Sequence, residues 1–322
     1  MNHSAAAVLD LEPAQSDFLE EVLRGLSQRP RTLPCKFFYD ARGAALFQKI
    51  CELPEYYITR TETAILRLHA HEMAQCFGAR CELLGLGTGA GTKTRILLEE
   101  LREPSVYIPI DISVKQLEKS AALFRRTFPH LEILPVCADY LQPFELPKSR
   151  SEPARKIVYF PGSTIGNFEP QQAGEFLRRI VDLSGTGGGL LIGVDLKKDP
   201  EIIERAYNDR TGITAEFNLN LLVRADRELG ANFDIAQWRH NAIYNSEEGR
   251  IEMYLVSEID QTVAIQDRHF HFDAGEKILT EYSYKHSREG FIALAKSVGF
   301  SFEHLWTDDA QLFGLFYFSV AR

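Results

Sequence analysis

The sequence predicts an α/β protein built on a doubly wound parallel sheet, with a second, smaller α+β domain beside it. Short apolar strands alternate with amphipathic helices from Cys81 to about residue 195. A run of alternate glycines joins the first of these strands to its helix, and strand-like segments follow at 250–285. Apolar strands that alternate with helices are typical of a parallel sheet that is covered on both faces.

The predicted main sheet can be followed along the chain. Its expected strands are 81–86, 106–112, 131–140, 156–163 and 188–196. The expected helices between them are 92–102, 113–127 and 170–183. Ser113 is a suitable N-cap for the second of these helices, because its hydroxyl can accept from a free backbone N–H in the first turn.

The remaining segments predict the second domain. Residues 14–80 are expected to be mostly helical, with loops around 31–40 and 53–62, and residues 200–248 to be mainly helical. Antiparallel strands are expected at 250–259, 262–272 and 277–285, followed by a capped helix at 287–299 and a final strand at 313–321. The last helix and strand are expected to rejoin the main sheet. We therefore place one domain at 61–199 plus 286–322 and the other at 10–60 plus 200–285.

Composition excludes several classes of protein. The chain has 322 residues and a formal net charge of −9, which argues against a nucleic-acid-binding surface. It has neither an apolar run of about 20 residues that could span a membrane nor a basic segment before its short apolar N-terminal run. Its five cysteines include no C-x-x-C pair, so we expect reduced thiols, a cytoplasmic protein and no structural metal site.

The stretch "CELLGLGTGAGTKTRIL" at 81–97 has glycine at every second position from Gly85 to Gly91. A nucleoside triphosphate loop is excluded, because glycine does not precede Lys93. The dinucleotide pattern G-x-G-x-x-A fits through Gly85, Gly87 and Ala90, although the glycines could also serve only a tight strand-to-helix turn.

Two acidic residues after successive strands help to decide whether the glycine loop binds a ligand, and which one. Asp111 ends the second strand and Asp139 follows the third. In a doubly wound sheet both lie outside the carboxyl ends of the strands, where ligands bind. One carboxylate suits a ribose diol and the other an adenine amino group, which favours S-adenosylmethionine. A nicotinamide-dependent oxidoreductase remains an alternative, although no hydride-transfer motif is evident.

Several long blocks then carry a resemblance to a known family. They are "LPCKFFYDARGAALFQKICELPEYYITRTE", "GSTIGN", "RAYND", "FNLNLL", "DRELG", "RIEMYL" and "LTEYSYK". Through them the sequence resembles the L-histidine Nα-methyltransferases of ergothioneine biosynthesis, over nearly the whole chain. The resemblance implies a Rossmann-like methyltransferase sheet, S-adenosylmethionine as methyl donor and free L-histidine as substrate. It implies three methyl transfers to the α-amino group, giving hercynine, by a metal-free enzyme that we expect to be a monomer.

The resemblance also implies roles for individual residues. Those matching substrate contacts are Tyr56, Asn167 and Tyr207 for the carboxylate and α-amino group, Glu281 and Ser283 for the imidazole, and Met253, Tyr282 and Gly162 around them. Tyr39 and Asn167 match catalytic positions near the amine. Those matching cofactor contacts are Gly87, Lys93, Asp111, Asp139 and Tyr140.

Other interpretations of these residues stay open at this point. A lone tyrosine is often an interface residue, Met253 could be core, Glu281 could face solvent, and Asn167 could serve a turn. The family's glycine loop usually reads E-L-G-S-G-T-S-E-K-T, so Gly85 replaces an acid here. That departure leaves open a non-catalytic ligand-binding protein. Another free amino acid, such as tyrosine or tryptophan, is an alternative substrate.

Overall fold

The computed structural model describes residues 8–11, 18–87, 89 and 91–321. Nine strands of the described chain form the main sheet: β1 (Leu9–Asp10), β3 (Cys81–Leu86), β4 (Val106–Asp111), β5 (Glu132–Ile133), β6 (Val136–Cys137), β7 (Arg155–Phe160), β8 (Gly189–Asp195), β14 (Phe300–Thr307) and β15 (Phe313–Val320). Their order is β1-β6-β4-β3-β7-β8-β15-β14, with β5 beside β4. The chain moves outward in opposite directions from β3 and β7, so the topological switch point lies between these two strands.

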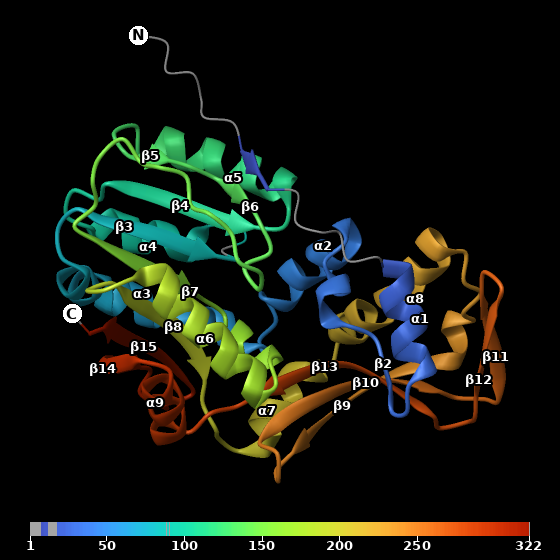
Figure 1. The fold of residues 1–322 in the computed structure, drawn as a ribbon. Helices are drawn as coiled ribbons and strands as arrows, with labels where there is room; N and C mark the ends of the chain where they lie inside the picture. Colours follow the sequence, from blue (N-terminus) through green and yellow to red (C-terminus); the bar gives the residue numbers. More distant parts are fainter. Residues whose placement is uncertain (1–7, 12–17, 88, 90, 322) are drawn as a thin grey trace.

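Helices cover both faces of this sheet (Figure 1). One face packs against α3 (Tyr57–Phe77), α4 (Thr92–Glu100) and α5 (Val114–Thr127), and the other against α6 (Pro170–Ser184) and α9 (Arg288–Ser297). Successive residues of β3 alternate between the two cores: Leu83 lies with the first helices and Leu84 with the second. The inner strands β3, β4 and β8 are almost completely buried and largely apolar, because helices cover both of their faces.

The second unit is built around a four-stranded sheet, with the order β2-β13-β10-β9. Its strands are β2 (Arg31–Thr32), β9 (Trp238–Asn245), β10 (Arg250–Ser257) and β13 (Lys277–Tyr284), and β11 (Gln261–Ile265) pairs with β12 (Arg268–Phe272). Its helices are α1 (Phe18–Ser27), η1 (Cys35–Phe38), α2 (Ala41–Ile50), α7 (Pro200–Tyr207), α8 (Ile213–Leu229) and η3 (Ile235–Gln237). Figure 1 shows the blue N-terminal α1 and β2 against the gold and orange elements of this unit.

The predicted doubly wound sheet and both predicted helix caps are confirmed. The hydroxyl of Ser113 accepts from the backbone N–H of Gln116 at 3.3 Å, at the start of α5. The hydroxyl of Ser287 accepts from the backbone N–H of Gly290 at 3.1 Å, at the start of α9. No helix in the described ranges is long and apolar enough to cross a membrane.

Several boundaries predicted from the sequence are wrong. The loop expected at 53–62 ends early, because α3 begins at Tyr57 and buries residues at helical spacing from there. The segment 200–248, expected to be mainly helical, ends in strand β9, which pairs with β10 along its whole length. The strand expected at 262–272 is a hairpin of β11 and β12, and the one at 131–140 is divided into β5 and β6. Strand β14 has no counterpart in the prediction.

Candidate active site

The glycine-rich turn after β3 has the backbone that close contact with a ligand requires. Gly87, Gly89 and Gly91 have φ values of +57°, +55° and +77°, in the left-handed region that favours glycine. A Cβ on Gly89 would meet no atom within 4 Å, so the backbone is accessible there. Ala90, the last position of the G-x-G-x-x-A pattern, lies outside the described residues.

The two predicted strand-end acids lie beside this turn. Asp111 accepts from the backbone N–H of Ser113 at 3.0 Å, and Asp139 accepts from that of Leu141 at 2.9 Å, each through Oδ1. These bonds fix both carboxylates beside the turn. The Tyr140 ring lies 3.6 Å from where a Cβ of Gly87 would be, so it lines the same turn. An open glycine backbone between two fixed carboxylates and an aromatic ring fits an adenosine.

Lys93 at the start of α4 is held by a buried carboxylate. Its Nζ lies 2.5 Å from Oε2 of Glu62, a completely buried residue of α3. The backbone N–H of Gly162 donates to the same oxygen at 3.0 Å, and the hydroxyl of Tyr159 donates to Oε1 at 3.3 Å. Gly162, which we grouped with the substrate residues, therefore lies beside Lys93. Sequence reasoning missed Glu62, because its partners are about 30 and 100 residues away along the chain.

A row of aromatic rings joins the N-terminal segment to α7. The ring of Phe47 lies 5.5 Å from that of Tyr39 and 6.3 Å from that of Tyr56, and the ring of Tyr56 lies 6.3 Å from that of Tyr207. Tyr56 and Tyr207 are buried, whereas Tyr39 is 46% exposed. Burial raises the pKa of Tyr56 and Tyr207, so these two remain neutral phenols at physiological pH.

Strand β13 directs the two predicted imidazole ligands to one face. Because side chains alternate along a strand, Glu281 and Ser283 share a face and Tyr282 lies on the other. Met253 of β10 is paired with Glu281 in register, so it lies on their face. The guanidinium of Arg250 lies 3.7 Å from the centre of the Tyr282 ring. The structure therefore does not bring Tyr282 together with the other predicted substrate residues.

Asn167 reaches β13 through a close backbone approach. It ends the short helix η2 (Thr164–Asn167), which packs against β13. A Cβ on Gly166 would lie 2.7 Å from the carbonyl oxygen of Tyr284 and 3.6 Å from the Ser283 hydroxyl, so only glycine allows this contact. Asn167 is therefore held next to the strand that carries Glu281 and Ser283.

Electrostatic interactions connect these groups into one site. Burial raises the pKa of Glu281 to about 7, although Lys285 opposes the shift. The charge of Glu281 contributes, after burial, to the raised pKa of Tyr39. Burial, Asp111 and Asp139 together raise the pKa of Tyr140, which also acts on Tyr39. Tyr140 thus stands between the adenosine-binding turn and the cluster around Glu281.

A buried ionic cluster supports the site from behind. Asp195, at the end of β8, lies 2.9 Å from Nζ of Lys285 and 2.5 Å from Nζ of Lys198. Tyr57 donates to Asp195 at 2.8 Å. Sequence reasoning missed this cluster, although two signals were present. Asp195 follows a parallel strand as Asp111 does, and Lys285 continues the alternation of Glu281 and Ser283.

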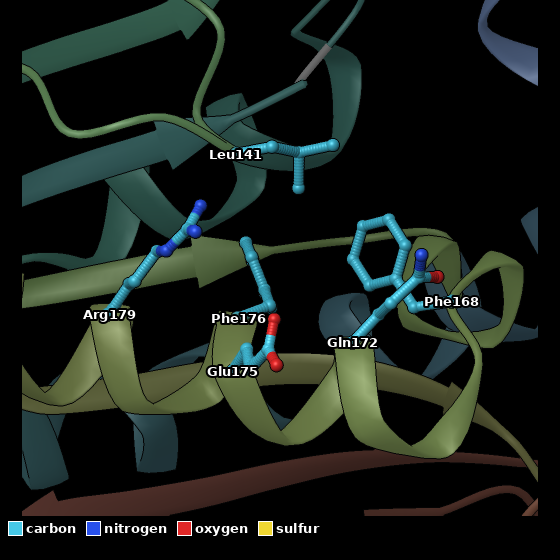
Figure 2. A pocket seen from close by; sticks show the side chains of 6 residues that line it. All are labelled: Leu141, Phe168, Gln172, Glu175, Phe176 and Arg179. Atoms are coloured by element: carbon cyan, nitrogen blue, oxygen red, sulfur yellow. The ribbon is translucent and has the colours of Figure 1, made fainter.

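A further pocket opens between α6 and the loop that carries Leu141 (Figure 2). Its lining residues are Leu141, Phe168, Gln172, Glu175, Phe176 and Arg179, none of which belongs to the predicted site. The ring of Phe176 lies 6.1 Å from that of Tyr140, so the pocket is behind the adenosine-binding turn. In the described part of the chain, no three His, Cys, Asp or Glu residues are grouped to hold a metal ion.

Comparison with known proteins gives consistent matches. Residues 18–320 match the family described as "Histidine-specific methyltransferase, SAM-dependent". The chain is 40% identical over 321 residues to "Histidine N-alpha-methyltransferase" of Mycolicibacterium smegmatis, covering 98% of each chain. It is 40% identical to the protein of the same name from Mycobacterium tuberculosis, covering 92% of each. It is also 33% identical to "Ergothioneine biosynthesis protein 1" of Neurospora crassa, covering 86% of this chain and 32% of that protein.

Proposed function

The chain belongs to the histidine-specific, S-adenosylmethionine-dependent methyltransferases, and from that premise we propose that it makes hercynine. It transfers three methyl groups in succession to the α-amino group of free L-histidine. The observation that carries this proposal is the placement of Glu281 and Ser283 on one face of β13, beside the end of the main sheet where Asp111 and Asp139 lie. The nicotinamide alternative is not favoured, since the family uses S-adenosylmethionine.

The residues around the glycine turn fit the methyl donor. In this proposal Asp111 and Asp139 accept from the ribose and adenine, and Tyr140 packs on the adenosine. Lys93, fixed by Glu62, places a cation for the carboxylate of the methionine part. The left-handed backbone at Gly87 allows the donor to approach the chain. When bound, S-adenosylmethionine supplies an electrophilic methyl group on its sulfonium.

The cluster on β13 fits the histidine side chain. An imidazole presents one N–H donor and one bare nitrogen, and Glu281 with Ser283 offers an acceptor and a hydroxyl on the same face. Met253 contributes an apolar surface next to them. Tyr56 and Asn167 are left for the carboxylate and α-amino group, and Tyr207, whose oxygen can still accept, for the α-amino group. We leave Tyr282 out of this assignment, because it faces the other side of β13.

Repeated methylation restricts how the amine can be held. Each transfer removes an N–H and the last leaves a permanent cation, so several N–H bonds cannot be maintained. The faces of Tyr39 and Tyr56 and the carbonyl of Asn167 can stabilise the cation at every stage. A phenol ionises only near pH 10, with a usual pKa of about 10, so Tyr39 is a poor base at neutral pH and we assign the proton from the ammonium to water. Most of the rate acceleration then comes from positioning the lone pair in line with the methyl group.

We also propose an oligomeric state, a metal requirement and a cellular compartment for this enzyme. The sulfonium of the donor activates the methyl group by itself, so we propose that the enzyme needs no metal ion, and we propose that it acts as a monomer. Its five cysteines, all within the described ranges, are free thiols. Free thiols are usual in a reducing compartment, which supports a cytoplasmic location.

The proposal is tested by mass spectrometry after purified protein is incubated with S-adenosylmethionine and each proteinogenic amino acid separately. We expect one, two and three methyl additions on histidine alone. Additions on tyrosine or tryptophan instead would overturn the assignment of Glu281 and Ser283 to an imidazole. The absence of any methylated amino acid, with S-adenosylhomocysteine still bound, would indicate a non-catalytic protein.

A further inference from the structure

Lys285 is a completely buried cation that touches the proposed histidine site from behind. Its Nζ donates to Oδ2 of Asp195 at 2.9 Å, to the hydroxyl of Tyr207 at 3.0 Å and to the hydroxyl of Ser283 at 2.7 Å. An ammonium group has three N–H donors and no lone pair. Lys285 therefore uses all its donors in these contacts, and both hydroxyl oxygens must accept from it.

The two hydroxyl groups also bind each other. The oxygens of Tyr207 and Ser283 are 2.8 Å apart, so one of the groups donates to the other. A phenol is more acidic than an alkyl hydroxyl and its oxygen is a weaker acceptor, which favours donation from Tyr207 to Ser283. Ser283 then accepts from both Lys285 and Tyr207, and both of its lone pairs are occupied. Its own O–H remains to donate to a bound ligand.

The charge of the cluster acts in the same direction. Lys285 and Lys198 share one carboxylate, that of Asp195. Burial lowers the pKa of Lys198 to about 8, so the three side chains carry a net positive charge below that pH. Burial opposes ionisation of Asp195, but the two lysines outweigh it and hold the pKa of this carboxyl below its usual value. Other titratable groups also face these residues from neighbouring elements. Those near Asp195 and its lysines are Tyr57, Tyr244, His286, Lys197 and Asp308. Those near Glu281 are Cys35, Tyr39, Tyr56 and Tyr140.

We propose that Lys285, anchored by Asp195, is a positioning residue that fixes Ser283 as a hydrogen-bond donor, so that the site accepts the histidine ring only as neutral imidazole. In a neutral ring, one nitrogen donates to the Glu281 carboxylate and the other accepts from Ser283. An imidazolium has a donor on both nitrogens, and the second would meet Ser283 with no lone pair available, next to a net positive charge. This inference rests on the proposed function.

The test measures the protons that accompany binding of hercynine, the trimethylated product. Its quaternary ammonium cannot titrate, so the imidazole ring is the one group of this ligand that changes charge between pH 5 and 8. The usual pKa of such a ring is about 6.5. Calorimetry on the protein with S-adenosylhomocysteine, in buffers of different ionisation enthalpy, counts the protons. At pH 8, where Glu281 is mostly ionised, we expect no proton uptake. Binding should weaken at lower pH, as the ring and Glu281, whose pKa is about 7, both become protonated. Uptake approaching one proton per hercynine at pH 8 would mean that the site binds imidazolium, and would overturn the inference.

Two variants separate the role of Lys285 from a merely structural one. Lys285→Met keeps Asp195 paired with Lys198 but frees a lone pair on Ser283. We expect the variant to bind hercynine about tenfold more weakly than the wild type at pH 8. Lowering the pH from 8 to 5.5 should then weaken hercynine binding by a smaller factor in the variant than in the wild type. Lys198→Met removes the other lysine that binds Asp195 without touching Ser283, so between pH 5.5 and 7, where Lys198 stays charged in the wild type, its pH dependence should match the wild type. A wild-type pH dependence in Lys285→Met would contradict the inference.

The outcomes also distinguish the inference from the proposed function. Wild-type protein that methylates histidine yet takes up a proton with hercynine would overturn only the inference. Wild-type protein that neither methylates histidine nor binds hercynine would overturn both. If Lys285→Met does not fold, the wild-type proton count at pH 8 still decides the question.

Discussion

Replacing Glu281 with glutamine removes the carboxylate from β13 while keeping the size of the side chain. A hydrogen bond to a charged group contributes about 1.5–3 kcal/mol, so kcat/KM for histidine should fall about 10- to 150-fold. The comparison belongs at pH 8, where a carboxyl group with a pKa of about 7 is mostly ionised. Binding of S-adenosylhomocysteine should be unchanged, because Glu281 lies outside the adenosine-binding turn.

The same substitution should not weaken the fold. Burial raises the pKa of Glu281 from 4.5 to about 7, so the folded protein holds this proton more tightly than the unfolded chain does. The carboxyl group therefore reduces stability as the pH rises from about 4.5 through 7, by at most about 3 kcal/mol at higher pH. Glutamine does not ionise. At pH 8 the ligand-free variant should unfold at the same temperature as the wild type or a higher one.

The assay combines initial rates at saturating S-adenosylmethionine with thermal unfolding at pH 8. Glu252→Gln is the matched control, because Glu252 is a buried glutamate of the neighbouring strand β10 that faces Arg250 and Tyr254 on the other side of the sheet. It should lose stability and keep its kcat/KM for histidine. Unchanged histidine kinetics in Glu281→Gln, or an equal kinetic loss in Glu252→Gln, would refute the reasoning.

Three further substitutions test other parts of the structure. Asp111→Asn should weaken S-adenosylhomocysteine binding about tenfold by calorimetry, because a charged acceptor is lost; unchanged binding would contradict its role. Gly166→Ala should lower the free energy of unfolding in urea by about 1–3 kcal/mol and raise the KM for histidine, because its Cβ would lie 2.7 Å from the Tyr284 carbonyl oxygen. Asp195→Asn should lower the free energy of unfolding by about 3–5 kcal/mol at pH 7, because Lys285 and Lys198 lose the carboxylate that they share. A urea midpoint equal to that of the wild type would count against this.

The elements that the sequence predicts well are those with a local signal. The alternation of apolar strands with helices predicts the sheet, and with it the placement of Asp111 and Asp139 at one edge. Residue alternation in β13 explains why Glu281 and Ser283 can act together, although their assignment to an imidazole came from the family resemblance. The same alternation argues against Tyr282 as a substrate contact.

The elements that the sequence misses depend on distant partners. Strand β9 has ordinary composition and becomes a strand because it pairs with β10. Glu62 is a buried anion only because α3 carries it to Lys93 and Gly162. Asp195 and Lys285 lie 90 residues apart in the chain and meet across the two units. Such pairs leave no local periodicity, so a single sequence cannot identify them.

The chain leaves the main sheet and returns to it at one place. Leu196 and His286 form a parallel bridge, and the backbone N–H of Lys197 donates to the carbonyl oxygen of His286 at 2.9 Å. Recombination between relatives at these two breakpoints would replace segment 197–285 with little disturbance of the main sheet. The exchanged segment would still need its own residues 18–50, because β2 pairs with β13 and α2 packs on α8. Inheritance of this unit therefore involves two separate stretches of the gene.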